Sequence, residues 1–242
     1  MQLLAGTTET RGRDSRVRVV RQGEIAPVAT FSAGVSRQPF SAFHLYDLEA
    51  PLTLHPGASR RIRLLGTDSV PVTLQYVMTG EMDYFRRLAD PQREEALMRY
   101  RVERPEGPDF SDVPLPKGTV RVFQRDEEGR LQLIGTDQIP NTPARDEPVL
   151  AIGRAFDVGG VRTQTGYRRL DDQVHESAWE VSLANRSDED VVVHVFERLQ
   201  GDWEIVSSSH EARQLSASRI VFDVPVPADG EATLAYRVRV RR

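Results

Sequence analysis

The sequence predicts an all-β protein with two β-sandwich-like domains, and three observations support this fold class. Apolar and polar residues alternate in many short runs, as they do in strands that bury one face. In the C-terminal part, turn-forming clusters recur about every 8–12 residues. The 17 Gly and 15 Pro are scattered between the apolar runs rather than collected in one segment.

The first 27 residues are predicted to form a flexible arm or an exposed edge strand. Between Thr7 and Gln22 the chain is mostly polar and rich in arginine. An arginine-rich arm can contact phosphate, but the acidic remainder of the chain favours a solvated terminus. The arm is therefore expected to contribute little to the core.

Residues 28–148 are predicted to form an N-terminal β domain. Its expected strands are 40–48, 51–54, 60–65, 70–79, 97–103, 120–124 and 131–134. Only Glu81 to Ala96 shows helical spacing, and Pro91 interrupts it, so at most one short helix or a long hairpin loop is expected there. The proline-containing stretch from Pro140 to Pro148 marks the predicted domain boundary.

Residues 149–242 are predicted to form an immunoglobulin-like β-sandwich, because about seven short strands follow one another in this part. The expected strands are 149–158, 162–170, 174–183, 191–197, 203–206, 220–226 and 232–240. The cysteine and tryptophan spacing of antibody domains is absent. Both alternating rows of Val191 to Glu197 are rich in apolar residues, which predicts a central strand covered on both faces.

Composition excludes several classes of protein and site. The formal net charge of −4 leaves no overall basic field, so a nucleic-acid partner is not expected. Without cysteine there are no disulfides, thiolate nucleophiles or cysteine-ligated zinc. No apolar run is long enough for a transmembrane segment, and Met1 to Gly6 lacks the features of a signal peptide. The sequence as given fits the cytoplasm, or an exported protein whose upstream signal peptide is missing, so the localisation stays open.

The tests for catalytic and cofactor motifs are negative. His175-Glu176 and His210-Glu211 begin like a zinc-protease motif, but Trp179 and Gln214 stand where the second histidine belongs. The chain contains no dinucleotide-binding glycine pattern, phosphate-binding loop or serine-hydrolase elbow. No cofactor and no metal site are predicted.

One turn nevertheless carries candidate catalytic residues. Glu197, Asp202 and Glu204 flank a turn beside Trp203, and a glycosidase needs two carboxylates near an aromatic platform. The alternative is that the acids are solvated turn residues and the tryptophan packs structurally. The last strand presents Arg237 and Arg239 on its polar face. The candidate binding residues are Trp203, Arg237 and Arg239.

Five short sequence blocks, which follow one another along the chain, carry a resemblance to a known family. They are FHLYDL at 43–48, PLPKGTVRV at 114–122, IPNTP at 139–143, GRAFDV at 153–158 and GDWEI at 201–205. These blocks resemble the domain-of-unknown-function family 4139, which includes the C-terminal part of mucoidy-inhibitor-A-like proteins. The resemblance covers the chain from about Phe40 to the end. It implies a bacterial protein with a β-rich fold, and it supplies no catalytic residues.

The sequence therefore leaves two hypotheses about the function open. The first is a noncatalytic interaction or envelope-associated module whose partner is a protein or a cell-envelope component, with self-association left open. The second is a hydrolase or carbohydrate-active domain that uses the carboxylates of Glu197, Asp202 and Glu204 with a nearby histidine. Acids that converge in a cleft about 5–10 Å apart favour the enzyme, and acids spread over the surface favour the module.

Overall fold

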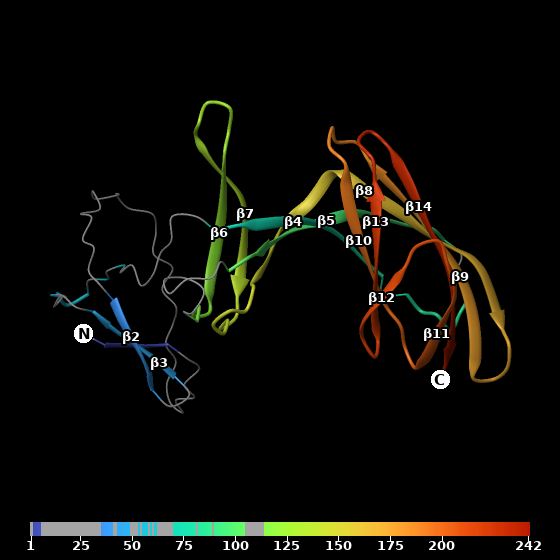
Figure 1. Cartoon of the computed structure of the whole chain (residues 1–242), viewed down its shortest axis with the longest axis horizontal. Helices are drawn as coiled ribbons and strands as arrows, with labels where there is room; N and C mark the ends of the chain where they lie inside the picture. The colour runs from blue at the N-terminus through green and yellow to red at the C-terminus, as the bar shows by residue number, and fades with distance from the viewer. Residues whose placement is uncertain are drawn as a thin grey trace. The chain divides into compact units, whose positions relative to one another are not determined.

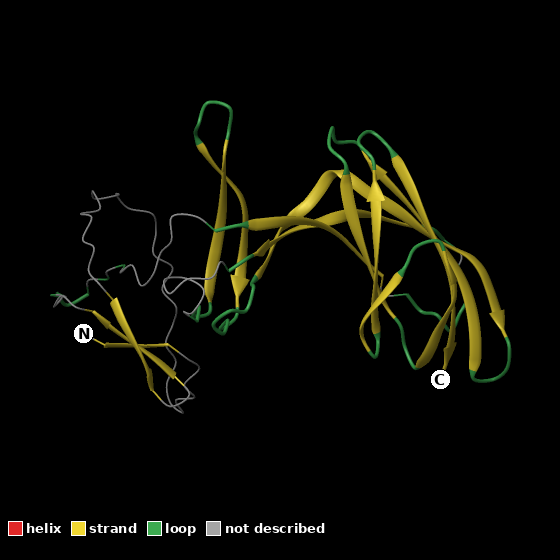
Figure 2. Cartoon of the chain, in the orientation of Figure 1, coloured by secondary structure: helices red, strands yellow, loops and turns green. Residues whose placement is uncertain are grey.

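The structure is a computed structural model. It describes residues 2–5, 35–40, 43–48, 53, 55–57, 59, 61, 70–80, 82–88, 90–104 and 114–242. Within these residues every helix-or-strand element is a β-strand, so the all-β prediction is confirmed there (Figure 2). The segment from Glu81 to Ala96, in which a short helix or a long hairpin loop was expected, contains no helix in its described part. Residues 82–88, 90 and 91 are irregular, and β5 (Gln92–Val102) begins directly after Pro91.

The chain divides into two compact units. One comprises Met1–Val70, Arg104–Gly118 and Pro140–Asp146, and the other comprises Pro71–Glu103, Thr119–Ile139 and Glu147–Arg242. The first unit holds a three-stranded antiparallel sheet in the order β1 (Gln2–Ala5), β3 (Phe43–Leu48), β2 (Val35–Phe40). Apart from β1, the predicted arm 1–27 lies outside the described residues, as do most of the predicted strands 51–54 and 60–65.

The second unit is dominated by one nine-stranded sheet (Figure 1). With β5, its strands are β4 (Val72–Gly80), β8 (Val149–Arg169), β9 (Val174–Asn185), β10 (Val191–Arg198), β11 (Asp202–Ser208), β12 (Ala212–Ser216), β13 (Arg219–Val226) and β14 (Glu231–Arg241). The spatial order is β11-β14-β9-β8-β5-β4-β10-β13-β12. All neighbours are antiparallel except β4 and β10, which are parallel. The predicted hairpin of β6 (Gly118–Arg125) and β7 (Leu131–Ile139) forms a separate two-stranded sheet.

The nine-stranded sheet folds over its own apolar face and nearly closes. Phe222 of β13 stacks on Tyr236 of β14 with 5.2 Å between ring centroids, although these strands lie near opposite ends of the strand order. Trp203 Nε1 on edge strand β11 donates a hydrogen bond of 2.7 Å to the carbonyl oxygen of Ala217, just after the other edge strand β12. The core therefore lies inside one curved sheet.

This architecture does not clearly correspond to the predicted pair of β-sandwich domains. β4 and β5, which fall within the predicted domain 28–148, are hydrogen-bonded into the same sheet as the strands of the predicted domain 149–242. An immunoglobulin-like sandwich consists of two separate sheets packed face to face. The continuous ladder from β11 to β12 does not clearly match that description.

In strand β10 the alternating residues point to two faces of the sheet that differ in burial. Val193 and Val195 are fully buried, and Glu197 continues the same inward row with 1% of its surface exposed. On the other face Val192 is 45% exposed. The prediction that this strand is covered on both faces therefore holds fully for one face only, because on the other His194 and Phe196 are half-buried and Val192 is exposed. β10 is central only in its hydrogen bonding, between β4 and β13.

Candidate functional site

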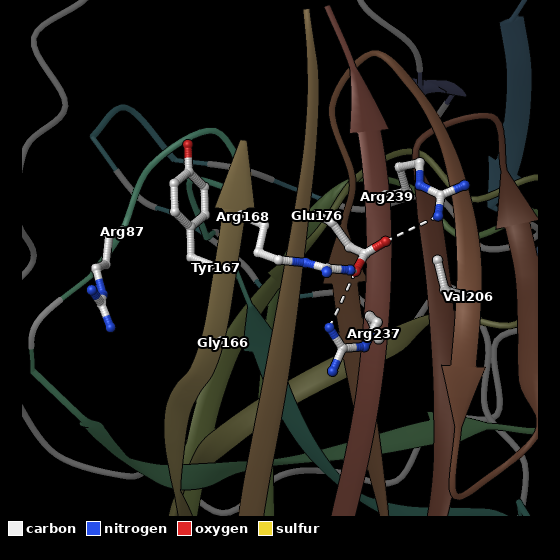
Figure 3. A pocket seen from close by; sticks show the side chains of 8 residues that line it. All are labelled: Arg87, Gly166, Tyr167, Arg168, Glu176, Val206, Arg237 and Arg239. Atoms are coloured by element: carbon white, nitrogen blue, oxygen red, sulfur yellow. Dashed lines mark hydrogen bonds and ion pairs between the residues drawn. The ribbon is translucent and has the colours of Figure 1, made fainter. Parts of the chain in front are cut away.

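An arginine cluster surrounds one glutamate on the outer face of β8, β9 and β14 (Figure 3). The strand register creates it: Glu176 of β9 pairs with Arg168 of β8 on one side and with Arg239 of β14 on the other. Directly opposite residues have Cβ atoms about 4.5–5.5 Å apart. Arg237 shares the face of Arg239, about 6.6–7 Å away along the strand. Three guanidinium groups can therefore reach the same carboxylate.

All three arginines donate hydrogen bonds to Glu176. Arg168 Nη2 lies 2.7 Å and Arg237 Nη1 lies 3.2 Å from Oε1, while Arg239 Nη2 lies 3.0 Å from Oε2. These guanidinium groups cover the glutamate, whose side chain is 2% exposed. A cavity of about 670 Å³ opens beside the cluster, and we call it the arginine pocket. It is lined by Arg87, Gly166, Tyr167, Arg168, Glu176, Val206, Arg237 and Arg239.

The hydrogen bonds keep the carboxylate of Glu176 ionised. The bond from Arg168 has the largest effect, and together with the bonds from Arg239 and Arg237 it lowers the pKa of Glu176 from 4.5 to about 2, against the opposing effect of burial. The ionised carboxylate orients the guanidinium groups but balances the charge of only one. The pocket lining thus combines four arginines with a single acid.

The depressed pKa predicts how stability depends on pH. Because the folded-state pKa of Glu176 is about 2, below the ordinary 4.5, its ionised form stabilises the native state above pH 4.5. This contribution is lost as the pH falls from 4.5 through 2. Glu176→Gln should be less stable than the parent at pH 7, and the difference should vanish near pH 2. Urea unfolding at pH 7, 4 and 2.5 measures it, and a constant difference over this range would contradict the assignment.

The predicted catalytic acids do not converge. Glu197 lies in the core, where its carboxylate forms an ion pair with Nη1 of Arg162 and accepts a 2.9 Å hydrogen bond from Tyr84 Oη. Asp202 and Glu204 instead lie exposed on the outer face of β11. The sequence placed these acids around one turn, whereas the alternation within β10 and β11 directs them to opposite faces of the sheet.

The predicted binding residues have different roles. Trp203 is half-buried, packs against the core and bonds to Ala217, so its ring anchors an edge strand and does not serve as an open platform. Arg237 and Arg239 do lie together in the arginine pocket. Three further pocket residues were not predicted from the sequence as site residues: Arg87, Arg168 and Glu176. Glu176 lies near the start of β9, where Ser177 and Glu180 are also polar, so the sequence of the strand alone does not single it out.

A second cavity, of about 380 Å³, lies where β4 and β5 separate beyond their last paired residues. It is lined by Thr79, Met82, Gln92, Arg93, Glu94 and Arg162. Beneath it, Gly80 makes room for the buried ion pair, because a Cβ atom at this position would collide with Oε2 of Glu197. Nη2 of Arg162 is buried without a hydrogen-bond partner in the described structure. This cavity borders a structural ion pair of the core.

Comparison with known proteins does not extend these observations. No family model, curated protein or solved structure matches the chain. Among the described residues, no group of three or more histidine and acidic side chains is placed to hold a metal ion. The described part also contains no helix long and apolar enough to cross a membrane.

Proposed function

We propose that this protein is a noncatalytic all-β interaction module that binds an anionic group of a partner protein or cell-envelope component in the arginine pocket. The proposal rests on the excess of arginine over acid in that pocket. The side chains of Arg168, Arg237 and Arg239 are 66%, 41% and 40% exposed, so they are accessible to a partner. Arg87 has no ion-pair partner within the described ranges.

The positions of the acids support a module over the alternative hydrolase. A glycosidase places its two carboxyl groups about 5–9.5 Å apart around one bond. Glu197 faces the core, whereas Asp202 and Glu204 face outward. Membership of the domain-of-unknown-function family 4139 and an immunoglobulin-like relationship of residues 149–242 are further proposals, and they rest on sequence patterns alone.

Binding of an acidic polymer tests the proposed function. At 20 mM salt, fluorescence anisotropy should detect binding of labelled poly-L-glutamate, because the pocket has unbalanced positive charge. Arg237→Ala should weaken binding about threefold or more, since it removes one pocket cation. Arg241→Ala is the matched control, because Arg241 is exposed on the same strand but lies outside the pocket. At 150 mM salt binding should weaken strongly, because screening acts over about 8 Å.

Two outcomes would contradict this function. Equal losses in Arg237→Ala and Arg241→Ala would show that only the general charge of β14 matters. Submicromolar binding of DNA or RNA at 150 mM salt, lost in Arg237→Ala, would identify a nucleic-acid site instead.

A further inference from the structure

Arg239 holds two carboxylates at once. Its Nη2 donates to Oε2 of Glu176 at 3.0 Å, and its Nη1 donates to Oε1 of Glu204 at 2.5 Å. Glu176 is covered, but the side chain of Glu204 is 60% exposed and projects from edge strand β11. One terminal nitrogen of this guanidinium thus donates to the internal acid, while the other donates to an exposed carboxylate.

Within the described residues, Arg168 and Arg237 have no second carboxylate partner comparable to Glu204. Each donates to Glu176 through a single terminal nitrogen, and no second carboxylate pairs with either of them in the described part of the chain. Their side chains are at least as exposed as that of Arg239. Two of the three guanidinium groups around Glu176 therefore remain open to an external acid, and the third is occupied by Glu204.

We infer, resting on the proposed function, that the ligand is an acidic peptide segment of a partner protein and that Glu204 competes with it for Arg239. Carboxylates accept charge-assisted hydrogen bonds from guanidinium groups, as the contacts of Arg239 with Glu176 and Glu204 illustrate. One exposed ion pair strengthens binding by only about fivefold or less, so useful affinity requires several acids in one ligand.

An extended peptide supplies acids at a suitable spacing. Alternate side chains of an extended chain lie about 6.6–7 Å apart on one side, and this is also the spacing of Arg237 and Arg239 along β14. Val206, which is 42% exposed, adds an apolar contact at the rim. A segment with acids at alternate positions can therefore place one carboxylate on Arg237. A second carboxylate can bind Arg239 when the ion pair between Arg239 and Glu204 is broken.

Removing the negative charge of Glu204 tests the inference. The probe is a labelled, end-capped decapeptide of alternating glutamate and serine, titrated at 20 mM salt. Glu204→Gln should bind it about threefold or more tightly than the parent, because glutamine removes the negative charge that competes for Arg239. Asp202→Asn is the matched control: it removes the same charge from the same exposed strand, but Asp202 does not contact the pocket. Its affinity should equal that of the parent.

The outcomes separate this inference from the proposed function. Unchanged affinity in Glu204→Gln, or an equal gain in Asp202→Asn, would overturn the competition by Glu204. If the parent still binds acidic ligands through Arg237, the proposed function survives that result. No binding of the decapeptide or of poly-L-glutamate by the parent would overturn both. A peptide with its glutamates in one block should bind more weakly, and equal binding would overturn the alternate spacing. Melting temperatures within a few degrees of the parent would verify that both variants fold.

Discussion

Replacing Glu197 by glutamine is expected to lower the free energy of unfolding by about 3–5 kcal/mol. The side chain of its partner Arg162 is only 2% exposed, so the substitution leaves a buried guanidinium charge without its counter-ion. Glutamine keeps an acceptor for the hydroxyl group of Tyr84, so the loss reports mainly on the charge. Urea unfolding followed by tryptophan fluorescence measures it.

Two further variants make this result specific. The double variant Glu197→Gln with Arg162→Met removes both charges and should be more stable than Glu197→Gln alone, because no uncompensated charge remains in the core. Glu204→Gln, at an exposed acid, should change stability by less than about 0.5 kcal/mol. A loss below about 1 kcal/mol in Glu197→Gln would contradict the buried ion pair and reopen a functional role for this glutamate.

Replacing Val193 by aspartate is expected to unfold the nine-stranded sheet. Val193 is completely buried, and an unpaired carboxylate there costs several kcal/mol against a total stability of about 5–15 kcal/mol. The neighbouring residue provides the control: Val192 is 45% exposed, so Val192→Asp should retain the fold. Circular dichroism and thermal melting distinguish the variants. A folded Val193→Asp protein with unchanged melting would show that the inward row of β10 has been assigned to the wrong face.

Local alternation was enough to predict most strands of the second unit. The inward positions of Leu234, Tyr236 and Val238 in β14 follow from a period of two, and all three are buried. The same rule applied to β10 also places Glu197 inward, in line with Val193 and Val195. From the sequence it was placed at a turn, either as a candidate catalytic acid or as a solvated residue, although a charged residue can be buried when it has a partner. That partner, Arg162, comes from a distant strand.

The arginine pocket could not be predicted in the same way, because it depends on register between strands. Arg237 and Arg239 were recognisable as a basic row on β14. Only the pairing of β9 with both β8 and β14 places Glu176 beside Arg168 and Arg239. A shift of one residue in either ladder would turn the side chains to the other face. The short strand β12, with its mostly exposed residues, also lacked the alternation needed for prediction.

The parallel pairing of β4 with β10 has a consequence for synthesis on the ribosome. Tyr76 of β4 pairs with Val193, more than about 100 residues later in the chain. At about 5–20 residues per second, β4 waits roughly 5–20 s or longer before that partner has been translated. During this interval one side of β4 lacks its native hydrogen-bonding partner. Completion of the sheet is therefore a late event in biogenesis, and nascent chains stalled before Val191 should be especially prone to aggregation.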